Sequence, residues 1–203
     1  MESSEEFQML KAKGDRLYDA AEYNQALVGY ARAISLDPSH AEMYYKKGNA
    51  FRGIGKHKEA VRNFNKALIL DSNNEYVYYT KGMALCKMGK YEEAIPCFDE
   101  YLNMVPAYYY YTTDAWFNKG LAFSKIGMNE ESIDCYDKAI GLNPKCPDVH
   151  YNKATVLYQM GRYQEAVDCY NKAISLRPHF VEAYYNKAVA LTALEKSEEA
   201  IDC

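Results

Sequence analysis

Hydrophobic and polar positions in this 203-residue chain recur every 34 residues. The repeat is most visible where Met88–Ile95 (MGKYEEAI) returns as Met160–Val167 (MGRYQEAV), two periods and a four-residue insert later. Within each period the apolar residues are spaced as on one face of a helix, and a residue near the middle, usually Gly, separates two segments of roughly fourteen residues. The pattern therefore predicts a helix, a turn and a second helix in each repeat, and no strands. The predicted repeats are 7–40, 41–74, 75–108, 113–146, 147–180 and an incomplete 181–203, with an insert at 109–112.

Two places in every repeat carry small residues, and a third place carries an aromatic ring in each complete repeat. The eighth place, in the predicted first helix, is Gly or Ala, and the twentieth, in the second helix, is Ala or Ser. Because small side chains let helices approach closely, we expect the ring at the twenty-fourth place to fill the space between the two helices. The eighth places are Gly14, Gly48, Gly82, Gly120, Ala154 and Ala188, and the rings are Tyr30, Phe64, Phe98, Tyr136 and Tyr170.

The fourth repeat carries a known signature most completely. Its residues are Trp116, Lys119, Gly120, Phe123, Ser132, Tyr136, Ala139 and Pro144. This spacing resembles the tetratricopeptide repeat (TPR), and the resemblance covers nearly the whole chain. It implies an all-α fold, an α-solenoid of antiparallel helix pairs in a right-handed superhelix, in which the first helices line a concave groove. We expect residues 1–203 to form a single array of this kind.

Composition and charge exclude several classes of protein. With 49% hydrophobic and 26% charged residues the chain can bury a core, and 24 basic against 28 acidic residues provide no positive field for nucleic acid. No segment approaches the roughly 18 apolar residues of a membrane span, and the first residues lack the features of a signal peptide. Six cysteines are too few for a disulfide scaffold and indicate thiols in a reducing compartment. We expect a cytoplasmic protein that neither binds nucleic acid nor spans a membrane.

The sequence offers no convincing catalytic or metal site. Glutamate pairs recur where the second helix of a repeat begins, as helix-end electrostatics favours. Cys146 and His150 could both touch zinc, but no second pair has matching spacing. No glycine-rich phosphate-binding motif is present. We therefore expect no enzymatic activity, no metal and no cofactor. Four cysteines share one place in successive repeats, so they cannot converge on one metal ion and more simply pack: Cys97, Cys135, Cys169 and Cys203.

The fifth and sixth places of the repeats face the predicted groove and carry the best candidates for binding. An aromatic ring at the fifth place and an amide at the sixth would match the side chains and the backbone of an extended peptide. The asparagines resemble the asparagine ladder of some peptide-binding TPR superhelices; alternatively, rings and amides only follow the repeat consensus. The rings are Tyr45, Tyr79, Phe117, Tyr151 and Tyr185, and the amides, in the last three repeats, are Asn118, Asn152 and Asn186.

A carboxylate clamp is largely absent. TPR co-chaperones that grip a C-terminal carboxylate use Lys, Asn and Arg side chains at places where this chain holds Lys11, Asp15, Lys46, Thr80 and Ala84. Because Asp15 would repel a carboxylate, we do not expect this chain to bind the acidic tails of the large heat-shock chaperones.

The seventh place, usually Leu in the family, is Lys in every repeat of this chain. The lysine stems can cover apolar surface while the ammonium groups reach water or a carboxylate. The alternative is a positive row that contacts an acidic partner. These residues are Lys13, Lys47, Lys81, Lys119, Lys153 and Lys187.

Two irregularities bear on possible partners. The insert at 109–112 spans about one helical turn, so we expect it to lengthen the first helix of the fourth repeat and give the groove a lip. The tyrosines at 108–111 either contact a partner or pack on the array. The sequence ends within the second helix of the sixth repeat, at Cys203, which suggests a fragment, a short form, or a face covered by another molecule.

Our leading hypothesis is a non-enzymatic adaptor that holds a protein or peptide partner, as an extended peptide or a helix, in its concave groove, mainly over repeats four to six. One alternative is self-association or assembly through the incomplete sixth repeat. Another is that the chain is the targeting part of a longer enzyme, such as a glycosyltransferase.

Overall fold

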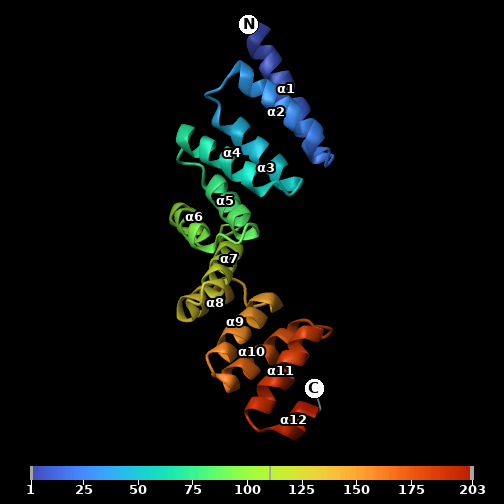
Figure 1. Ribbon diagram of the computed structural model, residues 1–203, viewed down its shortest axis with the longest axis vertical. Coiled ribbons are helices and arrows are strands. Elements are labelled where there is room, and N and C mark those ends of the chain that lie inside the picture. Colours follow the sequence, from blue (N-terminus) through green and yellow to red (C-terminus); the bar gives the residue numbers. More distant parts are fainter. Residues whose placement is uncertain (1, 110, 202–203) are drawn as a thin grey trace. The chain divides into compact units, whose positions relative to one another are not determined.

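The computed structural model describes residues 2–109 and 111–201 and is all-α over that range. Its twelve described helices form successive antiparallel pairs, and the described residues contain no strand, as the 34-residue pattern predicts (Figure 1). The chain divides into two compact units, of which the first ends at Met104 and the second begins at Val105.

The first unit contains the first three helix pairs. Each first helix packs most extensively against the second helix of its own pair, and α2 and α4 then pack against α3 and α5, the first helices of the following pairs. Buried Phe7, Leu10 and Tyr30 of the first pair thus share a cluster with Met43 of the second. The helices are α1 (Glu2–Asp19), α2 (Tyr23–Leu36), α3 (Ala41–Gly53), α4 (His57–Leu70), α5 (Glu75–Lys87) and α6 (Tyr91–Met104).

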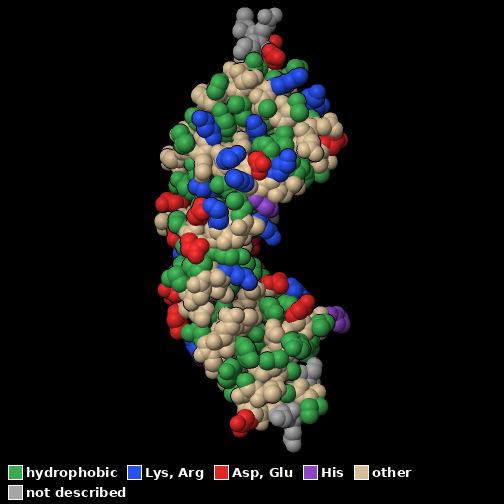
Figure 2. All heavy atoms as spheres, viewed as in Figure 1, with side chains coloured by type: hydrophobic (Ala, Val, Ile, Leu, Met, Phe, Trp, Pro, Cys, Tyr) green, Lys and Arg blue, Asp and Glu red, His purple; other side chains and the backbone are tan. Residues whose placement is uncertain are grey.

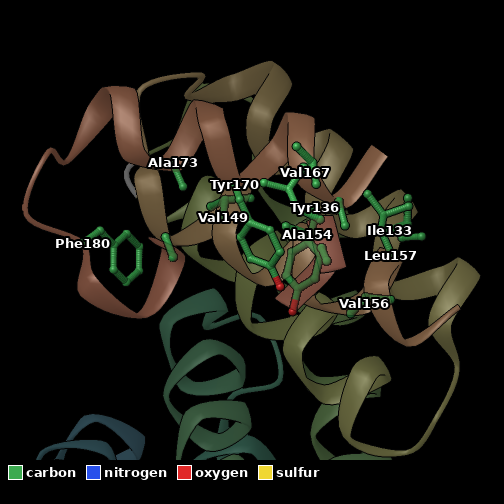
Figure 3. Close-up of a cluster of buried hydrophobic side chains, with 14 of the residues drawn as sticks. Ile133, Tyr136, Val149, Ala154, Val156, Leu157, Val167, Tyr170, Ala173 and Phe180 are labelled. Carbon is green, nitrogen blue, oxygen red and sulfur yellow. The ribbon is translucent and has the colours of Figure 1, made fainter. Parts of the chain in front are cut away.

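The second unit repeats this arrangement around one continuous cluster of buried side chains. Figure 3 shows Tyr136, Val149 and Tyr170 of this cluster gathered between the helices. The helices are α7 (Thr112–Lys125), α8 (Asn129–Leu142), α9 (Pro147–Gln159), α10 (Tyr163–Leu176), α11 (Val181–Ala193) and α12 (Ser197–Ile201).

Close packing of small residues against rings holds each pair together, as predicted. A Cβ atom placed on Gly14 would lie 2.6 Å from the Tyr30 ring, and one placed on Gly48 would lie 2.5 Å from the Phe64 ring. Both rings are almost completely buried. Because real Cβ atoms do not approach that closely, the glycines set the distance between the two helices of these pairs.

The turn inside each pair depends on one backbone conformation. At the fifteenth place of the repeat the chain is left-handed, with φ between 73° and 79° where the residue is glycine. Ala21 and Glu195 take the same conformation at this place, with φ of 59° and 60°. Since only glycine adopts it without steric strain, the first and sixth repeats carry strained turns.

The insert at 109–112 does not lengthen the first helix of the fourth repeat, so that expectation is wrong. The preceding helix α6 ends at Met104 and α7 begins at Thr112, which leaves nearly the whole insert in the connecting loop. Buried Thr112 explains why, because its Oγ1 donates a hydrogen bond to the carbonyl oxygen of Pro106 (3.2 Å) and closes the loop. Tyr108 in this loop is 89% exposed, and Tyr110 lies outside the described residues.

Candidate functional site

The first helices of consecutive pairs lie next to one another within each unit. α3 contacts α5 in the first unit, and α9 contacts both α7 and α11 in the second. Side chains at the fifth and sixth places bridge such neighbours, since Lys11 pairs with Glu42 across α1 and α3 and Asn186 bonds to Tyr151 across α11 and α9. These places therefore lie on the surface that the first helices form. We call the surface formed by α7, α9 and α11 the first-helix face of the second unit.

The asparagines at the sixth place lie one on each of the three helices of the first-helix face. Asn118 Nδ2 donates to the carbonyl oxygen of Asp114 (2.7 Å), and Asn152 Nδ2 donates to that of Asp148 (2.8 Å), one turn earlier in the same helix. Asn186 Nδ2 donates to a tyrosine hydroxyl on α9 (2.9 Å). An amide has two N–H donors and a carbonyl acceptor, so each side chain keeps one N–H and its Oδ1 without a partner among the described residues.

Rings at the fifth place differ in exposure. Those in repeats two to five are half-buried and pack against the buried ring at the twenty-fourth place of their own repeat. These four rings therefore contribute to the packing of their own repeats. Tyr185 differs, because 70% of it is exposed. The packed pairs, with centroids 5.9 to 6.2 Å apart, are Tyr45 and Phe64, Tyr79 and Phe98, Phe117 and Tyr136, and Tyr151 and Tyr170.

A stacked group beside the first-helix face was not predicted. Arg177, in the loop after α10, makes two hydrogen bonds to the carboxylate of Asp148, at 3.0 and 2.6 Å. Its guanidinium lies 4.5 Å from the centre of the Phe180 ring, which in turn lies 4.8 Å from the centre of the Tyr151 ring. The sequence held a signal for this group, because the fifth repeat alone ends in phenylalanine, three residues after an arginine.

In the first unit, ion pairs occupy places that a carboxylate clamp would use. Lys11 Nζ lies 2.6 Å from Glu42 Oε2, and Lys46 Nζ lies 2.8 Å from Asp15 Oδ1 and 3.5 Å from Glu42 Oε1. Burial lowers the pKa of Lys46, but its hydrogen bond to Asp15 and the charge of Glu42 outweigh burial and raise that pKa overall. Figure 2 shows basic and acidic side chains side by side on one face of this unit. These lysines therefore already face carboxylates of their own chain.

Sequence profiles of known families match most of the chain. Profiles described as tetratricopeptide repeat or TPR repeat match residues 14–55, 48–89, 75–108, 113–146, 147–180 and 169–202. The chain belongs to the tetratricopeptide repeat family. Both the predicted resemblance and the predicted fold class, an α-solenoid of antiparallel helix pairs, are confirmed.

Solved TPR structures share this fold. The structure of YrrB, a TPR protein with an unusual peptide-binding site, is 26% identical and superposes with a TM-score of 0.80 over 88% of this chain and 90% of YrrB. MamA is 26% identical, with a TM-score of 0.75 over 80% of this chain and 86% of MamA. Pseudomonas aeruginosa pilF is 22% identical, with a TM-score of 0.77 over 100% of this chain and 90% of pilF. No curated protein matches the chain. These similarities support a protein-interaction adaptor.

The lysines at the seventh place of this TPR chain make individual contacts with neighbouring side chains. Lys119 Nζ lies 5.1 Å from the centre of the Trp116 ring on its own helix. Lys153 Nζ pairs with Asp137 of α8, and Lys13 lines a pocket between α1 and α2. These contacts favour the interpretation in which the lysine stems cover apolar surface. That the six lysines form a positive row that contacts an acidic partner stays a prediction.

Thiols in the TPR core are held protonated. Burial raises the pKa of Cys86 to about 11, and burial is also the main cause of the raised pKa of Cys97 and of Cys169. Because the thiolate is the nucleophile and the metal ligand, these side chains act as packing residues. Cys203, at the same repeat place as Cys97 and Cys169, lies outside the described residues.

His150, which the sequence pairs with Cys146 as a possible zinc contact, bonds to the backbone of its own chain. Its Nε2 lies 3.0 Å from the carbonyl oxygen of Pro144, so the loop before α9 holds the ring. Among the described residues, no group of three or more His, Cys, Asp or Glu side chains is arranged to hold a metal ion. Nor does any described helix have the length and apolarity needed to cross a membrane.

Proposed function

We propose that this TPR protein is a non-enzymatic adaptor that binds an extended peptide segment of a partner protein along the first-helix face of its second unit. The observation that carries the proposal is the series of Asn118, Asn152 and Asn186, one on each of three adjacent helices. The partner would lie across α7, α9 and α11 and meet one amide from each.

Hydrogen bonds within the protein prepare these amides for a peptide backbone. An extended peptide presents N–H and C=O groups that are not paired within a strand or helix, and the asparagine Oδ1 and remaining N–H can accept and donate to them. In Asn118 and Asn152 the bond from Nδ2 to a carbonyl oxygen one turn earlier holds the amide in place. Such preorganisation reduces the ordering penalty, which is about 0.5–1.5 kcal/mol for each side chain immobilised on binding.

Apolar surface for the side chains of the peptide lies beside the amides. Tyr185 of α11 is 70% exposed. Phe180 is buried, and its contacts with Tyr151 and Arg177 hold the surface beside the amides in place. Aromatic side chains give large contact areas with little loss of rotamer freedom, as binding surfaces require. The similarity to YrrB, whose structure has a peptide-binding site, supports the same class of ligand for this chain.

Selection of peptides from a random displayed library, followed by calorimetric titration, tests the proposal. The ligand should bind the native chain and lose affinity when Asn118, Asn152 and Asn186 are all replaced by Ala. A typical hydrogen bond contributes about 0.5–1.5 kcal/mol. Three bonds together therefore predict a loss of at least about tenfold in affinity.

Exposed asparagines on the second helices provide a matched control. Asn65 of α4, Asn103 of α6 and Asn171 of α10 are all exposed, and their combined replacement by Ala should leave the affinity unchanged. Equal affinity of the native chain and of the variant that lacks Asn118, Asn152 and Asn186 would remove the proposal.

Self-association is a second candidate function, favoured by exposed apolar side chains on the last two described helices. Val181 and Tyr185 lie one turn apart on α11 and are 71% and 70% exposed, and Ile201 of α12 is 83% exposed. If these residues mediate association, sedimentation should show a dimer or larger species that Val181→Glu dissociates. A chain that stays monomeric at high concentration would exclude this second candidate.

A further inference from the structure

A pocket of about 190 Å³ opens between α1 and α2 in the first repeat. Leu10, Leu17 and Gly29 contribute to its lining, and exposed Val28 borders it. Lys13 of α1 and Arg32 of α2 also line it, and no acidic side chain does. An apolar pocket bordered by two cations is thus present in the first unit, on residues that take no part in the proposed function.

The fourth repeat shows what occupies the equivalent space elsewhere in the chain. There the fourth place is Trp116, whose ring packs against the core of the second unit. Lys119 Nζ lies 5.1 Å and Lys138 Nζ lies 4.2 Å from the centre of that ring. Lysines at these distances attract the face of an aromatic ring. The seventh and twenty-sixth places therefore hold cations around a ring at the fourth place.

The first repeat keeps both cations but lacks the ring. Its seventh and twenty-sixth places are Lys13 and Arg32, whereas the fourth place is Leu10. Gly29 stands at the twenty-third place, where the fourth repeat has a cysteine, and a Cβ atom on it would lie 3.3 Å from Gly14 Cα, so α1 and α2 approach closely at that point. The smaller residue at the fourth place, Leu10, leaves the pocket that the structure shows.

We propose that this pocket is a second binding site, which accepts one aromatic side chain of a partner protein from a segment with flanking acidic residues. Lys13 and Arg32 then hold the places that Lys119 and Lys138 hold around Trp116. The proposal goes beyond the adaptor surface of the second unit and does not depend on it.

Size and charge together specify this ligand. The pocket is smaller than the roughly 300–1,000 Å³ of sites for drug-sized molecules, so it suits one side chain rather than a cofactor. Neither Lys13 nor Arg32 forms an ion pair with another described residue, so their charges are available to carboxylates next to the ring. An acidic segment is therefore favoured over a neutral or basic one.

Nuclear magnetic resonance titration of the full chain tests the site with a defined probe. The probe is the peptide acetyl-Ser-Asp-Trp-Glu-Ser-amide, and the comparison peptide has Ala in place of Trp. Contacts of a single side chain predict weak binding, with Kd on the order of 1 mM. The Trp peptide should shift the backbone amide signals of Leu10, Val28 and Gly29, and the Ala peptide should bind at least tenfold more weakly.

Two variants copy other repeats of the same chain and so keep to residues that the fold already accepts. Leu10→Trp places in the first repeat the residue that fills the space in the fourth, and it should abolish binding. Val28→Asp copies Asp134 of the fourth repeat, adds a carboxylate beside Lys13 and Arg32, and should weaken binding at least fivefold. Because Val28 is 57% exposed, Val28→Asp keeps the test decisive even if Leu10→Trp disturbs folding.

Charge changes in the second repeat serve as the control. Lys47 and Lys66 occupy its seventh and twenty-sixth places. Their joint replacement by Ala should leave binding of the Trp peptide unchanged. Joint replacement of Lys13 and Arg32 by Ala should weaken binding of that peptide at least fivefold. The variant in which Asn118, Asn152 and Asn186 are replaced by Ala should bind the Trp peptide as the native chain does, which separates this site from the proposed function. Equal binding of the Trp and Ala peptides, or undiminished binding to Val28→Asp, would overturn the proposal.

Discussion

The turn between α1 and α2 offers a sharp test of how the repeats are stabilised. Ala21 is left-handed there, with φ of 59°, at a place where Gly55 of the second repeat has φ of 73°. The turns have the same hydrogen bonds: Ala21 N–H donates to the carbonyl oxygen of Tyr18 (2.9 Å), and Gly55 N–H donates to that of Arg52 (3.0 Å). Replacement of Ala21 by Gly should therefore relieve strain without changing any contact, and stabilise the protein.

The size of the effect follows from two opposing terms. A left-handed conformation costs a residue with a Cβ atom about 1–2 kcal/mol. Relief of this strain is partly offset, because glycine gives the unfolded chain more conformational freedom, which costs about 0.4–1 kcal/mol of stability. The net prediction for Ala21→Gly is a rise of about 0.5–1 kcal/mol in the free energy of unfolding.

Gly55→Ala is the matched opposite change. An added Cβ atom on Gly55 meets nothing within 4 Å, so only the backbone conformation opposes it, and the variant should lose about 0.5–1 kcal/mol. Urea unfolding of both variants, followed by circular dichroism, measures the two changes against the native chain. Unchanged or lower stability of Ala21→Gly, or a fully stable Gly55→Ala, would refute the reasoning.

Three further predictions concern the core, a thiol and an ion pair. Gly48→Leu should destabilise the first unit by at least about 1–3 kcal/mol, measured by urea unfolding, because even a Cβ atom there meets the Phe64 ring at 2.5 Å; native stability would show that the ring is not fixed. Cys86, whose pKa burial raises to about 11, should react with iodoacetamide far more slowly at pH 8 than a free cysteine does, and alkylation at the free-thiol rate would contradict its burial. Burial raises the pKa of Glu42, but Lys11 and Lys46 outweigh it and hold that pKa below the usual 4.5. The stabilising effect of the Glu42 carboxylate is present above pH 4.5 and is lost as the pH falls through its lower folded-state pKa. The difference in unfolding free energy between the native chain and Glu42→Gln should therefore shrink as the pH falls through that range. A difference that does not change with pH would show that the ion pairs of Glu42 contribute nothing.

Local patterns explain why the helix pairs could be predicted from the sequence. A small residue at the eighth place and a ring at the twenty-fourth recur at one spacing, and each such contact lies within one repeat. The structure accordingly places Tyr30 beside Gly14 and Phe64 beside Gly48. Because an extra Cβ atom at the glycine would clash with the ring, the residues at these two places determine how closely the two helices of a pair pack.

Features that depend on one particular contact could not be predicted in the same way. The insert at 109–112 was expected to be helical from its length alone, but a hydrogen bond from Thr112 to Pro106 holds it in a loop. The lysines of the seventh place have one residue type but different neighbours, which is why Lys119 meets a ring and Lys153 a carboxylate. The stack around Phe180 occurs in a single repeat, so no recurring sequence pattern indicates it.

Side-chain amide signals of the chain test the central claim most directly. With a peptide selected from the library bound to the isotope-labelled chain, the Nδ2 signals of Asn118, Asn152 and Asn186 should shift together, and those of Asn65, Asn103 and Asn171 should stay in place. Shifts confined to the second-helix asparagines, with the three signals of the first-helix face unmoved, would contradict the account.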